Sequence, residues 1–122
     1  MTDAQRTPTP IDTIADAWVD TLAEKDPTLA TYIGRFEDNG RFGDYSPEGA
    51  DALVSEARST KSALEASEAT DAIDTVTKMD LVRELDLMIE QHEAKTNLRD
   101  LNVIASPAQD IRSTFDLMPT AT

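Results

Sequence analysis

The sequence predicts an all-α fold of about four to five helices that pack antiparallel and are joined by irregular connections. Apolar residues recur at spacings of three and four along most of the chain, which is the period of a helix. The alternation of apolar and polar residues that is typical of strands never extends beyond four residues. A cap residue followed by proline, a frequent helix start, recurs at Thr9-Pro10, Asp26-Pro27, Ser46-Pro47 and Ser106-Pro107. With 122 residues, the chain has the length of a single domain.

The first helix is expected to follow a disordered tail over residues 1–8. Thr9 is its predicted N-cap, Pro10 its first residue, and Asp12 the acid that reaches back to complete a capping box. One face is apolar and consists of Ile11, Ile14, Ala15, Trp18 and Leu22. The opposite face is acidic and consists of Asp12, Asp16, Asp20 and Glu24. Because like charges four residues apart repel by a few tenths of a kcal/mol, we expect the acidic face to lie in water.

A short second helix is predicted from Asp26-Pro27 to Gly34, and residues 35–45 are predicted to form a loop. The loop contains three aromatic residues, which we expect to pack inward: Phe36, Phe42 and Tyr45.

Two longer helices are predicted next. The third helix begins at Ser46-Pro47 and carries a thin apolar stripe made of Ala50, Leu53, Ala57, Thr60 and Leu64. Either Asp71 or Asp74 can cap the fourth helix. Its stripe is the best defined in the chain and consists of Leu81, Val82, Leu85, Met88, Ile89 and His92.

An irregular connection is predicted over residues 98–106, followed by a last short helix that starts at Ser106-Pro107. The apolar residues of this helix are Ile111, Phe115 and Leu117.

The composition excludes several classes of function. The chain has 24 acidic and 11 basic residues and a net charge of −13, and its basic residues are scattered singly. Because phosphate binding requires clustered Lys and Arg, we expect no nucleic acid and no membrane as partner. No apolar run approaches the ~20 residues that span a bilayer, and no signal peptide is visible, so we expect a cytoplasmic protein. Without cysteine, the chain has no disulfide, thiolate zinc site or cysteine nucleophile.

The sequence predicts no catalytic, cofactor-binding or metal-binding residue in this chain. His92-Glu93 begins like the zinc motif H-E-x-x-H, but Thr96 stands where the second histidine is needed. We therefore expect His92 to be a hydrogen-bonded core residue. The acidic face of the first helix is straight, whereas calcium needs roughly 6–8 oxygens wrapped around it. No serine lies in a G-x-S-x-G turn, and the glycines form no phosphate-binding loop.

Three stretches of the sequence together follow the pattern of a known family. The first comprises residues 8–12 and 30–34 with Asp26-Pro27 between them, and the second comprises residues 45–49. The third and most specific comprises residues 98–112, followed by 115–119. In this order and spacing, the chain from about Thr7 to Thr122 resembles the N-terminal part of the bacterial family named domain of unknown function 885.

The resemblance implies that residues 1–122 are a single N-terminal segment, an incomplete helical lobe, of a longer protein. It further implies that the parent is a zinc-dependent metallopeptidase-like hydrolase, because family members carry an H-E-x-x-H motif in their later portion. That motif is absent from this sequence, so no zinc ligand or catalytic glutamate of the family falls on any residue here. We therefore expect no cofactor in this chain and zinc in the full-length parent. The implied partners are the remainder of the parent chain and, in the parent, a peptide substrate.

Two alternatives stay open at this point. Residues 102–109 are expected to lie nearest the substrate cleft of the parent, but Leu101, Val103 and Ile104 could instead pack into the helix layer. The whole chain could also be a self-contained acidic helical domain that binds or scaffolds without catalysis. We expect a complete domain to end in a capped helix or a polar tail, whereas residues 115–119 read Phe-Asp-Leu-Met-Pro. This ending favours a chain truncated at Thr122.

Overall fold

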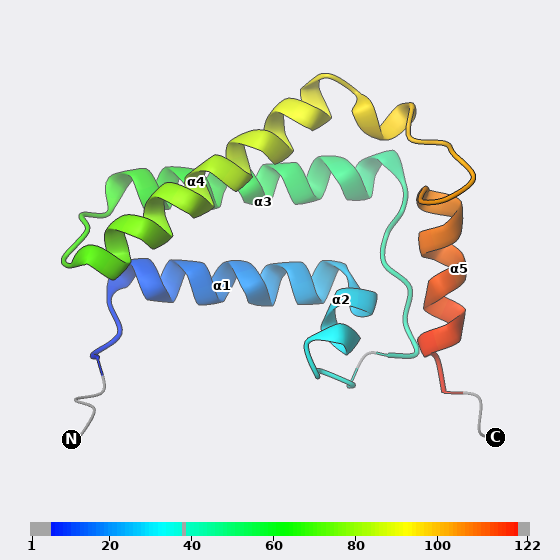
Figure 1. The fold of residues 1–122 in the computed structure, drawn as a ribbon, viewed down its shortest axis with the longest axis horizontal. Coiled ribbons are helices and arrows are strands. Elements are labelled where there is room, and N and C mark those ends of the chain that lie inside the picture. Colours follow the sequence, from blue (N-terminus) through cyan, green and yellow to red (C-terminus); the bar gives the residue numbers. More distant parts are fainter. Residues whose placement is uncertain (1–5, 38, 120–122) are drawn as a thin grey trace.

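The structure, a computed structural model, describes residues 6–37 and 39–119, and those residues form helices and no strand (Figure 1). The predicted all-α class is therefore confirmed. The helices are α1 (Pro10–Lys25), α2 (Pro27–Tyr32), α3 (Pro47–Ala66), α4 (Ala72–Glu93) and α5 (Pro107–Leu117), with a short 3-10 helix, η1 (Thr96–Leu98), after α4. None of the helices in the described ranges is long and apolar enough to cross a membrane.

The predicted helix starts are confirmed at the positions that the cap residues indicate. Thr9 and Asp12 form a capping box at the start of α1, and the Ser46 hydroxyl accepts a hydrogen bond from the Gly49 amide at 3.1 Å. Of the two candidates for α4, Asp71 is the N-cap, because its carboxylate accepts a hydrogen bond from the Asp74 amide at 2.8 Å. These contacts satisfy amides that have no partner within the helix.

Three helices, α1, α3 and α4, form the core of the molecule. They alternate in direction, and α3 and α4 lie side by side above α1 in Figure 1. The stripes predicted for these helices meet in the core, whose buried members are Ile11, Trp18, Val54, Ala57, Leu64, Leu85 and Ile89. Val54 is the one member that the predicted stripes omit. Its neighbour Leu53 is only partly buried against the core.

The remaining helices lie at one end of this bundle. The short α2 packs on α1, and α5 contacts α2 rather than the bundle core. The buried residue of α5 is the polar Thr114, whose hydroxyl lies 3.2 Å from that of Thr28. Phe115 of α5 is 57% exposed and has one ring partner, Phe42, with ring centroids 5.1 Å apart.

Two expectations about apolar residues outside the bundle are wrong. Phe36, Phe42 and Tyr45 do not pack inward and are 62%, 43% and 48% exposed, because the loop lies beside small helices that cannot cover it. Leu101, Val103 and Ile104 do not pack into the helix layer either, and each is more than 80% exposed. The chain leaves the bundle after α4 and runs outside it to reach α5 (Figure 1).

The tail predicted to be disordered over residues 1–8 differs from the structure at Arg6. Residues 1–5 of that tail lie outside the described residues. The Arg6 side chain contacts the carboxylates of Asp12, Asp71 and Asp74, so this part of the tail is held against the bundle.

Candidate functional site

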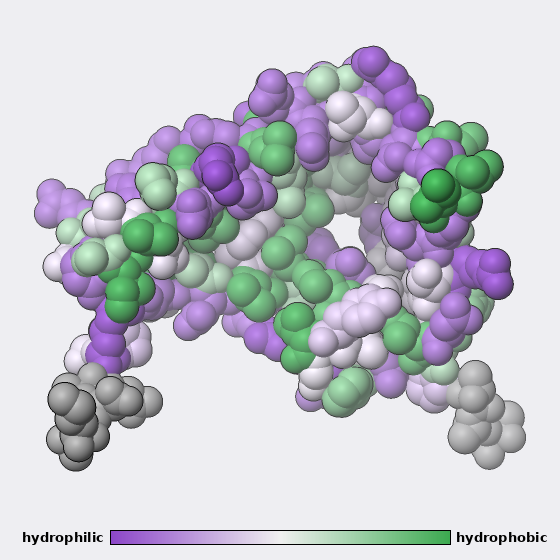
Figure 2. Space-filling model, viewed as in Figure 1, coloured by the Kyte–Doolittle hydropathy of each residue, from purple (hydrophilic) through white to green (hydrophobic). Residues whose placement is uncertain are grey.

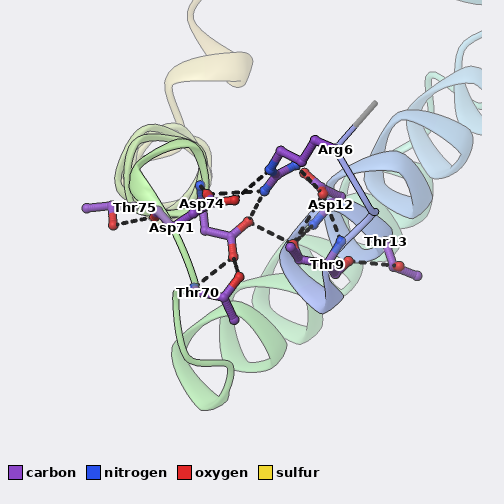
Figure 3. A network of polar contacts seen from close by, with 8 residues as sticks. All are labelled: Arg6, Thr9, Asp12, Thr13, Thr70, Asp71, Asp74 and Thr75. Carbon is purple, nitrogen blue, oxygen red and sulfur yellow. Dashed lines mark hydrogen bonds and ion pairs between the residues drawn. The ribbon is translucent and has the colours of Figure 1, made fainter. Parts of the chain in front are cut away.

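The first polar cluster joins the start of α1 to the start of α4 (Figure 3). Arg6 donates to Asp12 and Asp74 at 2.5 Å each and to Asp71 at 2.6 Å. The Thr9 hydroxyl accepts from the Asp12 amide and donates to Asp74 at 2.7 Å. The N-terminal segment, α1 and α4 are thereby tied together through one guanidinium and one hydroxyl.

Asp74 lies at the centre of this cluster and is fully buried. Burial alone would raise the pKa of its carboxyl, since it disfavours the charged form. Hydrogen bonds from the Thr70 amide and hydroxyl and from Thr9, together with the charge of Arg6, outweigh burial and lower the pKa to about 2. Asp74 accepts these bonds at 2.5–2.9 Å, so both of its oxygens are occupied. The cluster therefore stabilises the fold and offers no free base or metal ligand.

The second feature is a groove at the opposite end of α3. Two neighbouring cavities of about 560 and 580 Å³ share three lining residues, which are Ala50, Leu53 and Asn97. The smaller cavity lies between α3 and the end of α4, and the larger lies between α1, α3 and the start of α5. We call the pair the α3 groove, and Figure 2 shows the molecule hollowed between the bundle and α5.

The α3 groove has an apolar floor and a mixed polar rim. Leu22 and Leu29 lie in the larger cavity, and Val54 and Met88 in the smaller. The rim carries both signs of charge and includes Lys25, Asp26, Asp44, His92, Arg99 and Asp100. The larger cavity, whose lining is mostly apolar, has the usual form of a binding site, whereas most residues that line the smaller cavity are polar.

The comparison with known families agrees with the sequence pattern. The family model described as "Bacterial protein of unknown function (DUF885)" matches residues 27–122, which is most of the chain. The chain belongs to this family. The match includes α2 to α5, and therefore most of the α3 groove, whereas Arg6, Thr9 and α1 precede it. No curated protein matches the chain.

The acidic face of α1 in this DUF885 protein is exposed except at its first member. Asp16 and Glu24 are exposed, and Asp20 forms an exposed ion pair with Arg35 at 2.7 Å. Asp12 is half-buried because it joins the Arg6 cluster. In the part of the chain that the structure describes, no group of three or more His, Asp or Glu side chains is arranged to hold a metal ion.

His92 lies on the rim of the α3 groove rather than in the core. Its side chain is 26% exposed, and its Nε2 atom lies 2.9 Å from a carboxylate oxygen of Asp51. The expectation of a core histidine is wrong, because His92 lies in the last turn of α4, where the bundle opens, and its side chain faces the carboxylate of Asp51. Thr96 donates to the Gln91 carbonyl at 3.0 Å.

Sequence reasoning missed both the Asp74 cluster and the α3 groove. A buried aspartate three residues after an N-cap looks like an ordinary first-turn acid, and its partners Arg6 and Thr9 lie more than 60 residues away. No local sequence signal marks the groove, because its lining comes from helices that are distant in sequence.

Proposed function

We propose that this DUF885 protein is the non-catalytic N-terminal helical part of a zinc-dependent metallopeptidase-like hydrolase. Family membership and the resemblance given by residues 98–119 support this proposal. The catalytic zinc and a glutamate that acts as general base belong, in this proposal, to a part of the parent outside this sequence. The chain itself contributes a wall of the substrate cleft.

The observation that carries the proposal is an apolar surface at one end of the molecule. Four residues of the connection before α5 are more than two thirds exposed, and these are Leu98, Leu101, Val103 and Ile104. In Figure 2 hydrophobic atoms gather over this connection. Contiguous apolar surface of this kind marks a contact with another protein element. We assign that contact to the remainder of the parent chain, with residues 102–109 nearest the cleft.

The test is to extend the reading frame and to assay the longer protein. We expect an H-E-x-x-H motif beyond this sequence, one bound zinc per site, and peptide hydrolysis that a chelator abolishes. Replacing both histidines of that motif should remove zinc and activity while leaving the helical content unchanged. A longer frame without the motif, or a longer protein that neither binds zinc nor hydrolyses peptides, would contradict the proposal.

The alternative, a self-contained acidic helical domain for binding or scaffolding, is supported by the net charge of −13 and the α3 groove. It predicts a monodisperse monomer that does not bind apolar dyes. The cytoplasmic location stays a prediction, which fractionation of the source cells would test.

A further inference from the structure

We propose that α5 and the turn before it form an arm that detaches as a unit while α1, α3 and α4 stay folded. We call residues 102–117 the α5 arm. The inference goes beyond the proposed function, because it concerns a motion of this chain alone and needs neither zinc nor hydrolysis. Three features carry it: the face by which α5 docks, the few contacts that hold it, and a division in the polar contacts of the connection.

The face by which α5 docks is mostly polar, which is the reverse of an ordinary amphipathic helix. The buried and half-buried side chains on this face, the N-cap included, are Ser106, Gln109, Ser113, Thr114 and Leu117. The exposed face instead carries apolar side chains at spacings of three and four, which are Ala108, Ile111 and Phe115. Since burial of apolar surface is the main force that fixes a helix to its neighbours, this docking stabilises α5 only weakly.

Few contacts hold α5 against the rest of the molecule. Among the helices of the described residues, α5 contacts only α2, and it stands beside the bundle in Figure 1. The Thr114 hydroxyl lies 3.2 Å from that of Thr28 and 3.5 Å from that of Tyr45. Neutral contacts of this kind add little net free energy, because water replaces them when the helix leaves. An element that rests on so few buried apolar contacts opens well before the whole molecule unfolds.

The polar contacts of the connection before α5 divide into two groups, which locates the hinge. Arg99 donates to a carbonyl at the end of α4 at 2.9 Å. The Asn102 side chain accepts from two amides that follow it, at 2.9 and 2.7 Å, and Gln109 donates to the Asn102 carbonyl at 3.5 Å. The turn is thereby fastened to α5. Between the two groups lie the exposed Asp100 and Leu101, joined to the turn by a long contact of 3.4 Å from Asp100 to Asn102. The hinge therefore lies at Asp100 and Leu101.

Detachment of the α5 arm changes two surfaces at once. The arm carries Val103 and Ile104, so the apolar surface assigned above to a protein contact moves with it. Pro107, at the start of α5, lines the larger cavity of the α3 groove, whereas Leu98, before the hinge, lines it from the other side of the connection. When the arm leaves, Pro107 leaves that wall and Leu98 stays. The hollow that Figure 2 shows between the bundle and α5 then opens on the side of α5.

The experiment measures how fast single cysteines react with a thiol reagent in the full chain, which has no cysteine of its own. Ser106→Cys and Thr114→Cys place a thiol at two buried positions of the docking face of α5. Ala57→Cys places it in the bundle core, and Ser62→Cys, at an exposed position of α3, gives the unprotected rate. Circular dichroism verifies that each variant is folded.

We expect the two α5 thiols to react at the same rate within about threefold, because one motion exposes both. They should react at least about 100-fold faster than Ala57→Cys, which requires unfolding of the bundle. Below the unfolding transition, urea should hardly change the α5 rates and should steeply raise that of Ala57→Cys, since the urea dependence scales with the surface exposed.

Two further substitutions separate the seat of α5 from the bundle. Phe42→Ala removes the ring partner of Phe115, whose centroid is 5.1 Å away, and should accelerate both α5 thiols about fivefold while leaving Ala57→Cys unchanged. Leu64→Ala weakens the bundle core and should accelerate Ala57→Cys about 100-fold while changing the α5 thiols by less than about twofold.

Equal rates or equal urea dependence for the α5 thiols and Ala57→Cys would overturn the inference, because α5 would then leave only when the bundle unfolds. Rates at Ser106→Cys and Thr114→Cys that differ by more than about tenfold would also overturn it, since they would show fraying of one end rather than release of a unit. None of these outcomes bears on zinc or hydrolysis in the longer protein.

Discussion

The two ends of the helical bundle differ in how their polar and apolar side chains are arranged. At one end, Arg6 and Thr9 bind a fully buried Asp74, and every buried polar side-chain atom in the described residues has a hydrogen-bond partner. At the other end, α5 buries Thr114 and leaves Phe115 and the connection before it exposed. At the first end, which we call the closed end, the polar groups are satisfied, although the first turns of α4 expose Ile73, Val76 and Met79 by 55%, 53% and 61%. The second end, which we call the open end, combines a groove with apolar residues that are up to 91% exposed. The groove and the stronger exposure indicate that the open end is the more favourable surface for contacts with other molecules.

The largest effect on stability is expected when the Asp74 cluster at the closed end is disrupted. Asp74→Ala removes the acceptor of four hydrogen bonds and leaves Thr9 and Thr70 without their partner. Loss of one partner from a buried charged network is strongly destabilising. We expect the melting temperature to fall by roughly 15 °C. Asp16→Ala, at an exposed position of α1, is the control and should change it by less than about 2 °C.

A pair of leucines compares the core with the open end. Leu64 is fully buried and Leu101 is 82% exposed. Leu64→Ala should lower the free energy of unfolding by about 3 kcal/mol, because it leaves a cavity in the core. Leu101→Ala should lower it by less than about 0.5 kcal/mol. Urea denaturation measures both, and equal losses would show that the connection before α5 is packed.

These expectations rest partly on features that the sequence already predicted. The helix starts could be predicted because a cap such as Thr9 and its partner Asp12 are three residues apart. The core could be predicted because the stripe containing Leu85 and Ile89 has the period of a helix. The Asp74 cluster and the α3 groove could not be predicted, because each depends on how helices distant in sequence are placed. The exposure of Val103 could not be predicted either, since a hydrophobic residue in a loop gives no signal of what covers it.

The Asp74 cluster at the closed end should also make the free energy of unfolding depend on pH. The pKa of Asp74 is lowered from its ordinary value of 3.8 to about 2, so the folded protein keeps this carboxylate ionised at a lower pH than the unfolded chain does. Its contribution is fully present above about pH 4 and is lost as the pH falls toward 2. The urea concentration at the midpoint of unfolding, measured from pH 7 to pH 2, should fall as the pH decreases from about 4 toward 2. Asp74→Asn should flatten the decline, whereas Leu64→Ala should keep it.

The smallest effect on stability is expected from charges placed at the open end. The double variant Val103→Asp and Ile104→Asp changes two residues that are more than 80% exposed, so the melting temperature should stay within about 2 °C. Binding of an apolar dye should fall, because the variant interrupts the exposed apolar surface. Unchanged dye fluorescence would place the dye-accessible surface elsewhere. The control is Ser62→Asp, which adds a charge at an exposed position of α3 and should leave dye binding unchanged.

Hydrogen exchange most directly tests the central claim, that the open end is a contact surface. In this chain alone, amides of α1, α3 and α4 should exchange slowly, and those of residues 98–117 should exchange fast. In the longer protein of the proposed function, residues 98–117 should become protected while the Arg6 end keeps the same protection. Equal exchange of residues 98–117 in both proteins would contradict the claim.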